Sequence, residues 1–124
     1  MTSLCTTMLT DYNIDGVICT RQKPSDIFDN EIILARNEDD LLSARGSRYA
    51  PVYVCRGIKD LGLKEGGTYV FVGKPCDIQA LMKYQRVVKK YNFFKIAIFC
   101  AHTPLMSATK EIIDQSGINL KDIS

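Results

Sequence analysis

The segment 69–84 restricts the fold of this chain more than any other part of its sequence. Residues 69–72 are aromatic or β-branched, which is typical of a buried strand, and Gly73 follows where the backbone must turn. Pro75 suits the first turn of a helix, because the N–H that proline lacks would have no partner there anyway. The apolar run 96–100 then predicts a second strand. A strand, a helix and a strand in this order predict two parallel strands joined by a crossover, a βαβ unit.

The remaining segments predict further strands and helices around this unit. The predicted strands are 14–20, 31–35, 69–72 and 96–100, and the predicted helices are 1–11, 37–45, 75–91 and 107–115. Residues 52–55 have the composition of a strand, although a helical turn that continues to residue 61 fits equally well. Together these segments predict a single α/β domain over residues 1–124, with a mixed, mainly parallel sheet and flanking helices.

The composition excludes several classes of function. The formal net charge of +2 is too small to favour nucleic acid or an anionic membrane as a partner. No apolar run is long enough to span a bilayer. The five cysteines include no C-x-x-C pair, which fits a reducing cytoplasm better than a disulfide framework and offers no obvious complete metal site. We therefore expect a cytoplasmic protein.

Two cysteines occupy positions where a thiol can be functional. Cys76 lies in the first turn of the predicted helix, where the helix dipole and Lys74 favour a thiolate. Cys100 closes the second predicted strand, and ligands gather at the carboxyl ends of parallel strands, so both cysteines can face one crevice. Most free cysteines are small buried hydrophobes, and that interpretation stays open for both. His102, just past the same strand, is a candidate acid or ligand.

The loop 46–51 carries a hydroxyl, a guanidinium and a phenol at the successive positions Ser47, Arg48 and Tyr49. Such a loop is usually a turn with a solvated arginine. Alternatively, it presents donors to a phosphate and a ring to a flat ligand.

Three segments in this order resemble one known family. They are Gly46-Ser47-Arg48-Tyr49-x-Pro51, Val72-Gly73-Lys74-Pro75-Cys76-Asp77-Ile78-x-Ala80-Leu81 and Ile98-Phe99-Cys100, and Ile14-Asp15-Gly16-Val17-Ile18 falls in matching order before them. The combination is similar to the coenzyme F-420 hydrogenase/dehydrogenase beta-subunit family, and the similarity covers most of the chain, up to Cys100. Arg48 stands where a lysine is common in that family, which keeps the charge but changes the donor geometry.

The resemblance implies a flavin-dependent oxidoreductase. Such a protein passes electrons between a bound FAD, iron-sulfur clusters and a partner, which is a deazaflavin (coenzyme F-420) or another redox protein. By resemblance, Ser47, Arg48 and Tyr49 line the FAD site, while Gly73 and Pro75 let the backbone approach the cofactor.

The same resemblance suggests metal ligands and a longer protein. Cys76 and Cys100 become candidate ligands of a 4Fe-4S cluster, which usually needs four thiolates. This chain supplies only part of the set unless Cys19 or Cys55 lies close to them. Thr2 matches a threonine that follows a glycine pair in the family, and the family continues past the point that matches Ser124. We therefore expect residues 1–124 to be a segment of a longer subunit.

Two other classes of function stay open at this point. A Cys76/His102 nucleophilic pair predicts a thiol enzyme, which rapid labelling of Cys76 by iodoacetamide would favour. A non-catalytic nucleotide- or partner-binding module is the other alternative, favoured if the chain folds but binds neither flavin nor iron.

Overall fold

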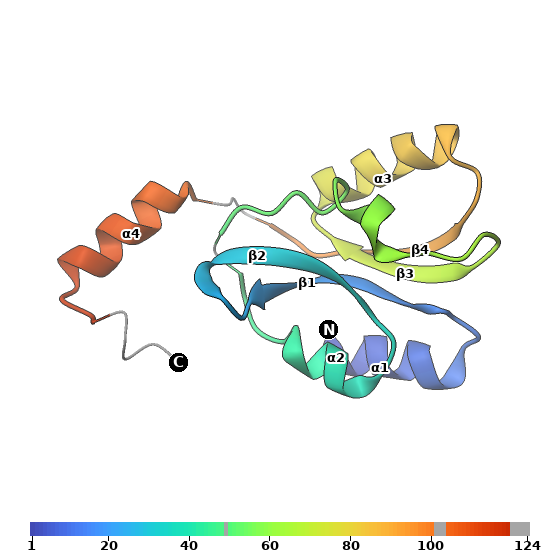
Figure 1. The fold of residues 1–124 in the computed structure, drawn as a ribbon, viewed down its shortest axis with the longest axis horizontal. Coiled ribbons are helices and arrows are strands. Elements are labelled where there is room, and N and C mark those ends of the chain that lie inside the picture. The colour runs from blue at the N-terminus through green and yellow to red at the C-terminus, as the bar shows by residue number, and fades with distance from the viewer. Residues whose placement is uncertain (49, 101–103, 120–124) are drawn as a thin grey trace.

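The computed structural model describes residues 1–48, 50–100 and 104–119. Its centre is a four-stranded sheet in the order β2-β1-β3-β4 (Figure 1). Strands β1 (Gly16–Lys23) and β2 (Asp26–Ala35) are antiparallel, whereas β3 (Thr68–Gly73) is parallel both to β1 and to β4 (Asn92–Ala97). The predicted mixed, mainly parallel α/β fold is confirmed, and β3, the helix after it and β4 form the predicted βαβ unit.

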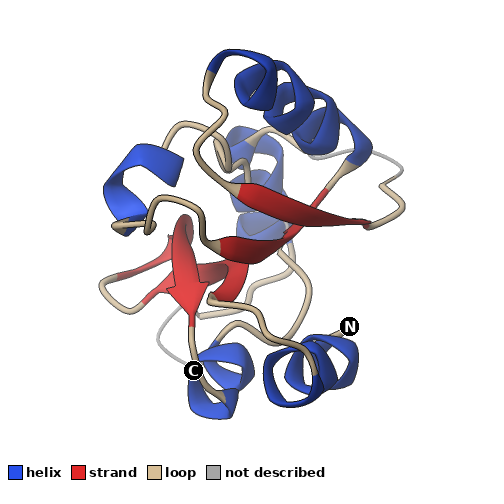
Figure 2. Ribbon diagram, turned by 90° about the vertical axis from the view of Figure 1, so that its right-hand side faces the viewer, coloured by secondary structure: helices blue, strands red, loops and turns tan. Residues whose placement is uncertain are grey.

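Helices lie on both faces of the sheet (Figure 2). They are α1 (Thr2–Asp11), α2 (Glu38–Ser43), the short 3-10 helix η1 (Ile58–Leu61), α3 (Pro75–Val87) and α4 (Met106–Gln115). In Figure 1, α1 and α2 lie below the sheet, α3 lies above it, and α4 stands to one side. The sheet is thus the middle layer of three.

The side chains of β3 alternate between the two layers of the core. Tyr69 and Phe71 pack in one buried cluster with Leu81 of α3, whereas Val70 and Val72 belong to a second cluster with Cys5 of α1. This division follows from the pleat, because residues two apart on a strand share a face. Since β3 is covered on both faces, the turn that follows it is held by a rigid element.

The second half of the βαβ unit begins and ends earlier than the sequence predicts. Helix α3 ends at Val87 instead of near Tyr91, and β4 spans Asn92–Ala97 instead of 96–100. The pairing of β3 with β4 ends at Gly73↔Ala97, where β3 turns toward α3, and a last hydrogen bond runs from the Ile98 N–H to the Gly73 carbonyl at 2.9 Å. Cys100 therefore follows the strand in a coil and does not close it, which corrects the prediction.

Other boundaries differ less. Strands β1 and β2 are both longer than predicted, since they continue toward each other into a hairpin around Pro24 and Ser25. The segment 52–55 forms no strand; it leads through a turn into η1, which is close to the helical alternative.

Candidate functional site

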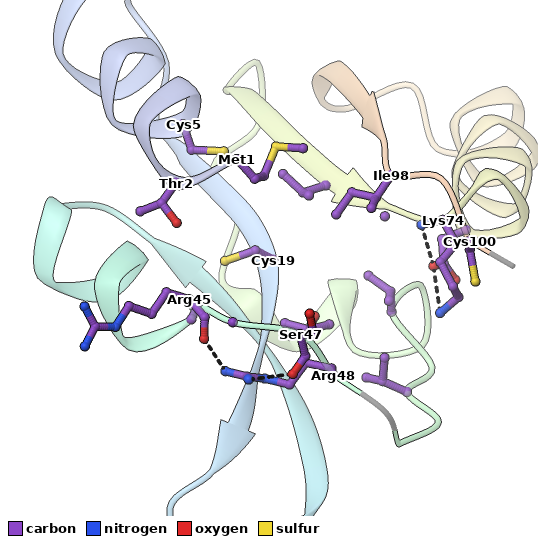
Figure 3. Close-up of a pocket in the computed structure, with 18 of the residues that line it drawn as sticks. Met1, Thr2, Cys5, Cys19, Arg45, Ser47, Arg48, Lys74, Ile98 and Cys100 are labelled. Carbon is purple, nitrogen blue, oxygen red and sulfur yellow. Dashed lines mark hydrogen bonds and ion pairs between the residues drawn. The ribbon is translucent and has the colours of Figure 1, made fainter. Parts of the chain in front are cut away.

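A cavity of about 620 Å³ opens at the carboxyl end of the parallel strands (Figure 3). Its walls come from the start of α1, the middle of β1, the loop after α2, the turn between β3 and α3, and the chain after β4. This position is the one where open α/β sheets bind ligands. The volume falls within the range of roughly 300–1,000 Å³ that is typical of small-molecule and cofactor sites.

Arg48 lies on one wall of the cavity, and its guanidinium donates hydrogen bonds to backbone carbonyls of the same loop. Arg48 Nη1 donates to the carbonyl oxygen of Ser47 at 3.1 Å, and Nη2 donates to the carbonyl oxygen of Arg45 at 3.0 Å. Both bonds are drawn in Figure 3. The carbonyl of Arg45 lies just after α2, so Arg48 places a cation near the negative end of that helix dipole.

The turn between β3 and α3 forms a second polar wall. Asp77 Oδ2 accepts a hydrogen bond from the Lys74 backbone N–H at 3.0 Å and lies 3.2 Å from the Lys74 ammonium. These contacts cap the first turn of α3. A Cβ on Gly73 would lie 2.9 Å from both Asp77 Cβ and Phe71 Cε1, so glycine is needed for α3 to begin this close to the strand.

We predict that Asp77 contributes to stability mainly as a cap. Asp77→Ala leaves the Lys74 N–H without its partner, which we expect to lower the free energy of unfolding by about 1–2 kcal/mol. Asp77→Asn is the matched control, because its amide oxygen can still accept that bond, and we expect a smaller loss. Urea denaturation of both variants measures the difference. Equal losses would indicate that the charge of Asp77, and not the cap, is what matters.

The remaining wall is apolar and rich in sulfur. Met1, Cys5 and Cys19 lie together along it in Figure 3, and Leu41 and Val72 complete it. Burial raises the pKa of the Cys5 thiol, and burial together with the nearby Cys5 and Asp40 raises the pKa of Cys19 to about 12. At neutral pH both groups are therefore uncharged thiols.

The structure brings most of the predicted cofactor residues to this cavity. Thr2, Ser47, Arg48 and Gly73 all line it. Pro75 is the first residue of α3, one position after the lining residue Lys74, and does not itself line the cavity. Tyr49 lies outside the described residues.

The two predicted metal ligands differ in their surroundings. Cys100 is exposed and lines the cavity, whereas Cys76 is exposed in the first turn of α3 and is not among the lining residues. Residues 1–48, 50–100 and 104–119 contain no group of three or more His, Cys, Asp or Glu side chains placed to hold a metal ion. His102, the proposed partner of Cys76 in a thiol enzyme, lies outside the described residues.

Sequence reasoning missed several residues of the site. Cys5 and Cys19 line the cavity, but nothing in their local patterns distinguishes them from other core positions. Asp77 had a usable signal, because an acidic residue at the third position of a helix often accepts a hydrogen bond from the N-cap residue. Cys55 lies beside the start of α3, where its thiol donates to the Asp77 carbonyl at 3.5 Å.

Comparison with models of known protein families shows the family to which the chain belongs. Residues 1–59 match the model for the N-terminal part of the coenzyme F-420 hydrogenase/dehydrogenase beta subunit, and residues 66–124 match the model for its C terminus. The chain belongs to this family. The resemblance inferred from the loop 46–51 and the segment 72–81 is thereby confirmed.

The F-420 hydrogenase/dehydrogenase fold is also found in a solved structure, described as a xenon derivatization of the F-420-reducing nickel-iron hydrogenase complex from Methanosarcina barkeri. A chain of that complex superimposes with a TM-score of 0.80 over 97% of the present chain, at 24% sequence identity. At this identity the likeness establishes the fold alone. The present chain spans 44% of the length of that chain.

No curated protein matches the chain. Within the part of the chain that the structure describes, no helix of this beta-subunit family member is both long and apolar enough to cross a membrane.

Proposed function

We propose that this chain forms the FAD-binding part of an oxidoreductase subunit that transfers electrons between FAD and a deazaflavin (coenzyme F-420) or another redox partner. The observation that carries the proposal is the cavity at the carboxyl end of the sheet, where Thr2, Ser47, Arg48 and Gly73 converge in a member of this family.

The chemistry of the cavity walls fits a flavin dinucleotide. FAD combines an anionic pyrophosphate with a flat, largely apolar ring system, and it needs a site with both characters. The cavity offers the cation of Arg48 and the hydroxyls of Thr2 and Ser47, and it sets them against the apolar wall around Leu41 and Val72. Because Cys5 and Cys19 are uncharged thiols, that wall does not repel an anion.

Each residue has a distinct task in this proposal. Arg48 and Ser47 bind the anionic part of the cofactor by charge-assisted and neutral hydrogen bonds. Gly73 and Pro75 shape the site through the tight turn into α3, and Tyr49 is proposed as a further residue of the FAD site. FAD, when bound, supplies the hydride and single-electron chemistry, and the chain positions it and excludes water from the apolar wall.

We also propose Cys76 and Cys100 as ligands of an iron-sulfur cluster. The described residues do not fit a complete 4Fe-4S site, since they offer no group of three or more suitable side chains. These two thiols therefore contribute at most part of the ligand set.

The redox partner is proposed from the same comparison. The solved structure that shares this fold is a hydrogenase complex, which favours a protein partner for the full subunit. The small-molecule alternative is a deazaflavin, and the family description names coenzyme F-420.

The absorption spectrum of the full protein, purified without oxygen, tests the proposal. We expect flavin bands that bleach with dithionite and that return when FAD is added to the stripped protein. A broad iron-sulfur shoulder together with iron in the purified protein would support the cluster ligands. A folded protein that stays colourless after reconstitution with FAD, iron and sulfide would contradict the assignment and favour a non-catalytic nucleotide- or partner-binding module.

A further inference from the structure

We infer that the backbone carbonyls of Ser47 and Arg45 compete with the ligand of this cavity for the Arg48 guanidinium. The guanidinium donates to these carbonyls in this structure and exchanges them for an anionic group when that group binds. This inference rests on the proposed function, because it takes a pyrophosphate-containing cofactor as the ligand.

The first observation is where the guanidinium donors point. Arg48 Nη1 and Nη2 donate to the carbonyl oxygens of Ser47 and Arg45, at 3.1 and 3.0 Å. A guanidinium presents its donors in a rigid planar fork, so it cannot hold both carbonyls and also give a bidentate pair to a phosphate from the same two nitrogens. A ligand that uses this fork must displace at least one of the two carbonyls.

The second observation is the state of the third nitrogen. Arg48 Nε is buried and has no hydrogen-bond partner among the described residues. A buried N–H without a partner is unfavourable, so the present arrangement leaves part of the bonding capacity of Arg48 unused. Because Nε is covered, an anion can reach it only if the side chain or the loop moves.

The third observation is the backbone of the loop. Gly46 has φ +95°, a conformation that other residues rarely adopt, and it lies between the two carbonyl acceptors. Glycine therefore permits the sharp turn between α2 and Ser47. A Cβ at Gly46 would lie 3.4 Å from Arg48 Nη1, which shows how closely the guanidinium folds back on the loop.

These observations give the exchange a direction. The bonds to Ser47 and Arg45 pair the guanidinium with neutral acceptors, whereas a phosphate adds an opposite charge and can accept two parallel bonds from the fork. The released carbonyls belong to exposed residues, so water can replace the guanidinium there. We therefore expect an anionic ligand to accept hydrogen bonds from Arg48, whereas a neutral ligand of similar shape leaves the Arg48 bonds to Ser47 and Arg45 intact.

Arginine side-chain NMR of the full protein tests this exchange directly. The Nε–Hε resonance of Arg48, assigned through its bonds to the backbone, is followed while FAD is added and, in a second titration, while inorganic pyrophosphate is added. We expect the Arg48 resonance to shift on saturation by more than that of Arg56. Arg56 is an exposed arginine that does not line the cavity, and it serves as the internal control.

The outcomes separate this inference from the proposed function. If FAD binds and the Arg48 resonance does not move, the exchange is wrong and the FAD proposal stands. If FAD fails to bind but pyrophosphate shifts Arg48, the exchange stands and the FAD proposal is wrong. If neither FAD nor pyrophosphate binds, both are overturned.

Discussion

Arg48→Met is expected to weaken FAD binding to the full protein by about 10- to 100-fold. The substitution removes a guanidinium from the cavity wall but keeps a long apolar stem that can fill the same space. A hydrogen bond to a charged group is worth roughly 1.5–3 kcal/mol, and each 1.4 kcal/mol corresponds to about a tenfold change in affinity. Isothermal titration of the flavin-free protein with FAD measures the effect.

Two further variants make the Arg48 result specific. Arg56→Met removes an exposed arginine outside the cavity and should leave the dissociation constant unchanged. Arg48→Lys keeps the positive charge but loses the planar fork, so an intermediate affinity is expected. If Arg48→Met and the wild type bind FAD equally well, the loop 46–51 is only a solvated turn, which was the alternative interpretation of its sequence.

The βαβ unit was predictable because each of its signals is local. The aromatic and β-branched run 69–72, the glycine that ends it and the proline that begins the helix all act within a few residues of one another. The position of β4, in contrast, is not set by a local signal. Residues 96–100 are continuously apolar, but a strand at this edge pairs only as far as β3 extends, and β3 ends at Gly73. The exposed side chains of Ile98 and Phe99 follow from that limit.

The site was predictable only in part, for the same reason. The loop 46–51 and the turn at Gly73 carry distinctive residues, and both reach the cavity. The apolar wall depends on α1 packing under β1, a contact between segments that share no local signal. Cys5 and Cys19 therefore looked like any other core positions. The direction of the Arg48 guanidinium was likewise inaccessible, since it depends on carbonyls that every residue possesses.

The buried thiol of Cys19 should make the protein lose stability at alkaline pH. Its pKa is raised to about 12 in the folded protein, chiefly by burial, against 9.0 for an unperturbed thiol. The raised value means that the unfolded chain releases this proton first. The stability that Cys19 contributes is therefore complete below pH 9 and is lost as the pH rises from 9 toward 12.

The size of this loss follows from linkage. Each pH unit between the two pKa values costs about 1.4 kcal/mol, so roughly 2 kcal/mol should be lost between pH 8 and pH 10.5. Comparing the wild type with Cys19→Ala isolates this contribution, because lysines, tyrosines and the other cysteines are present in both proteins. We expect the difference in their free energies of unfolding, measured in urea with a reductant present, to change by that amount.

A second variant shows whether titration is the cause. Cys19→Ser differs from Cys19→Ala in packing and polarity, but neither side chain ionises in this pH range. Relative to the wild type, both should therefore show the same change between pH 8 and pH 10.5, whatever their stabilities at pH 8. If the free energy of unfolding of the wild type changed with pH as much as those of both variants, Cys19 would ionise equally in the folded and unfolded chains. A thiol with a pKa near 9.0 is still protonated at neutral pH, so the sulfur-rich wall would remain uncharged toward an anionic cofactor, but Cys19 would no longer make stability depend on alkaline pH.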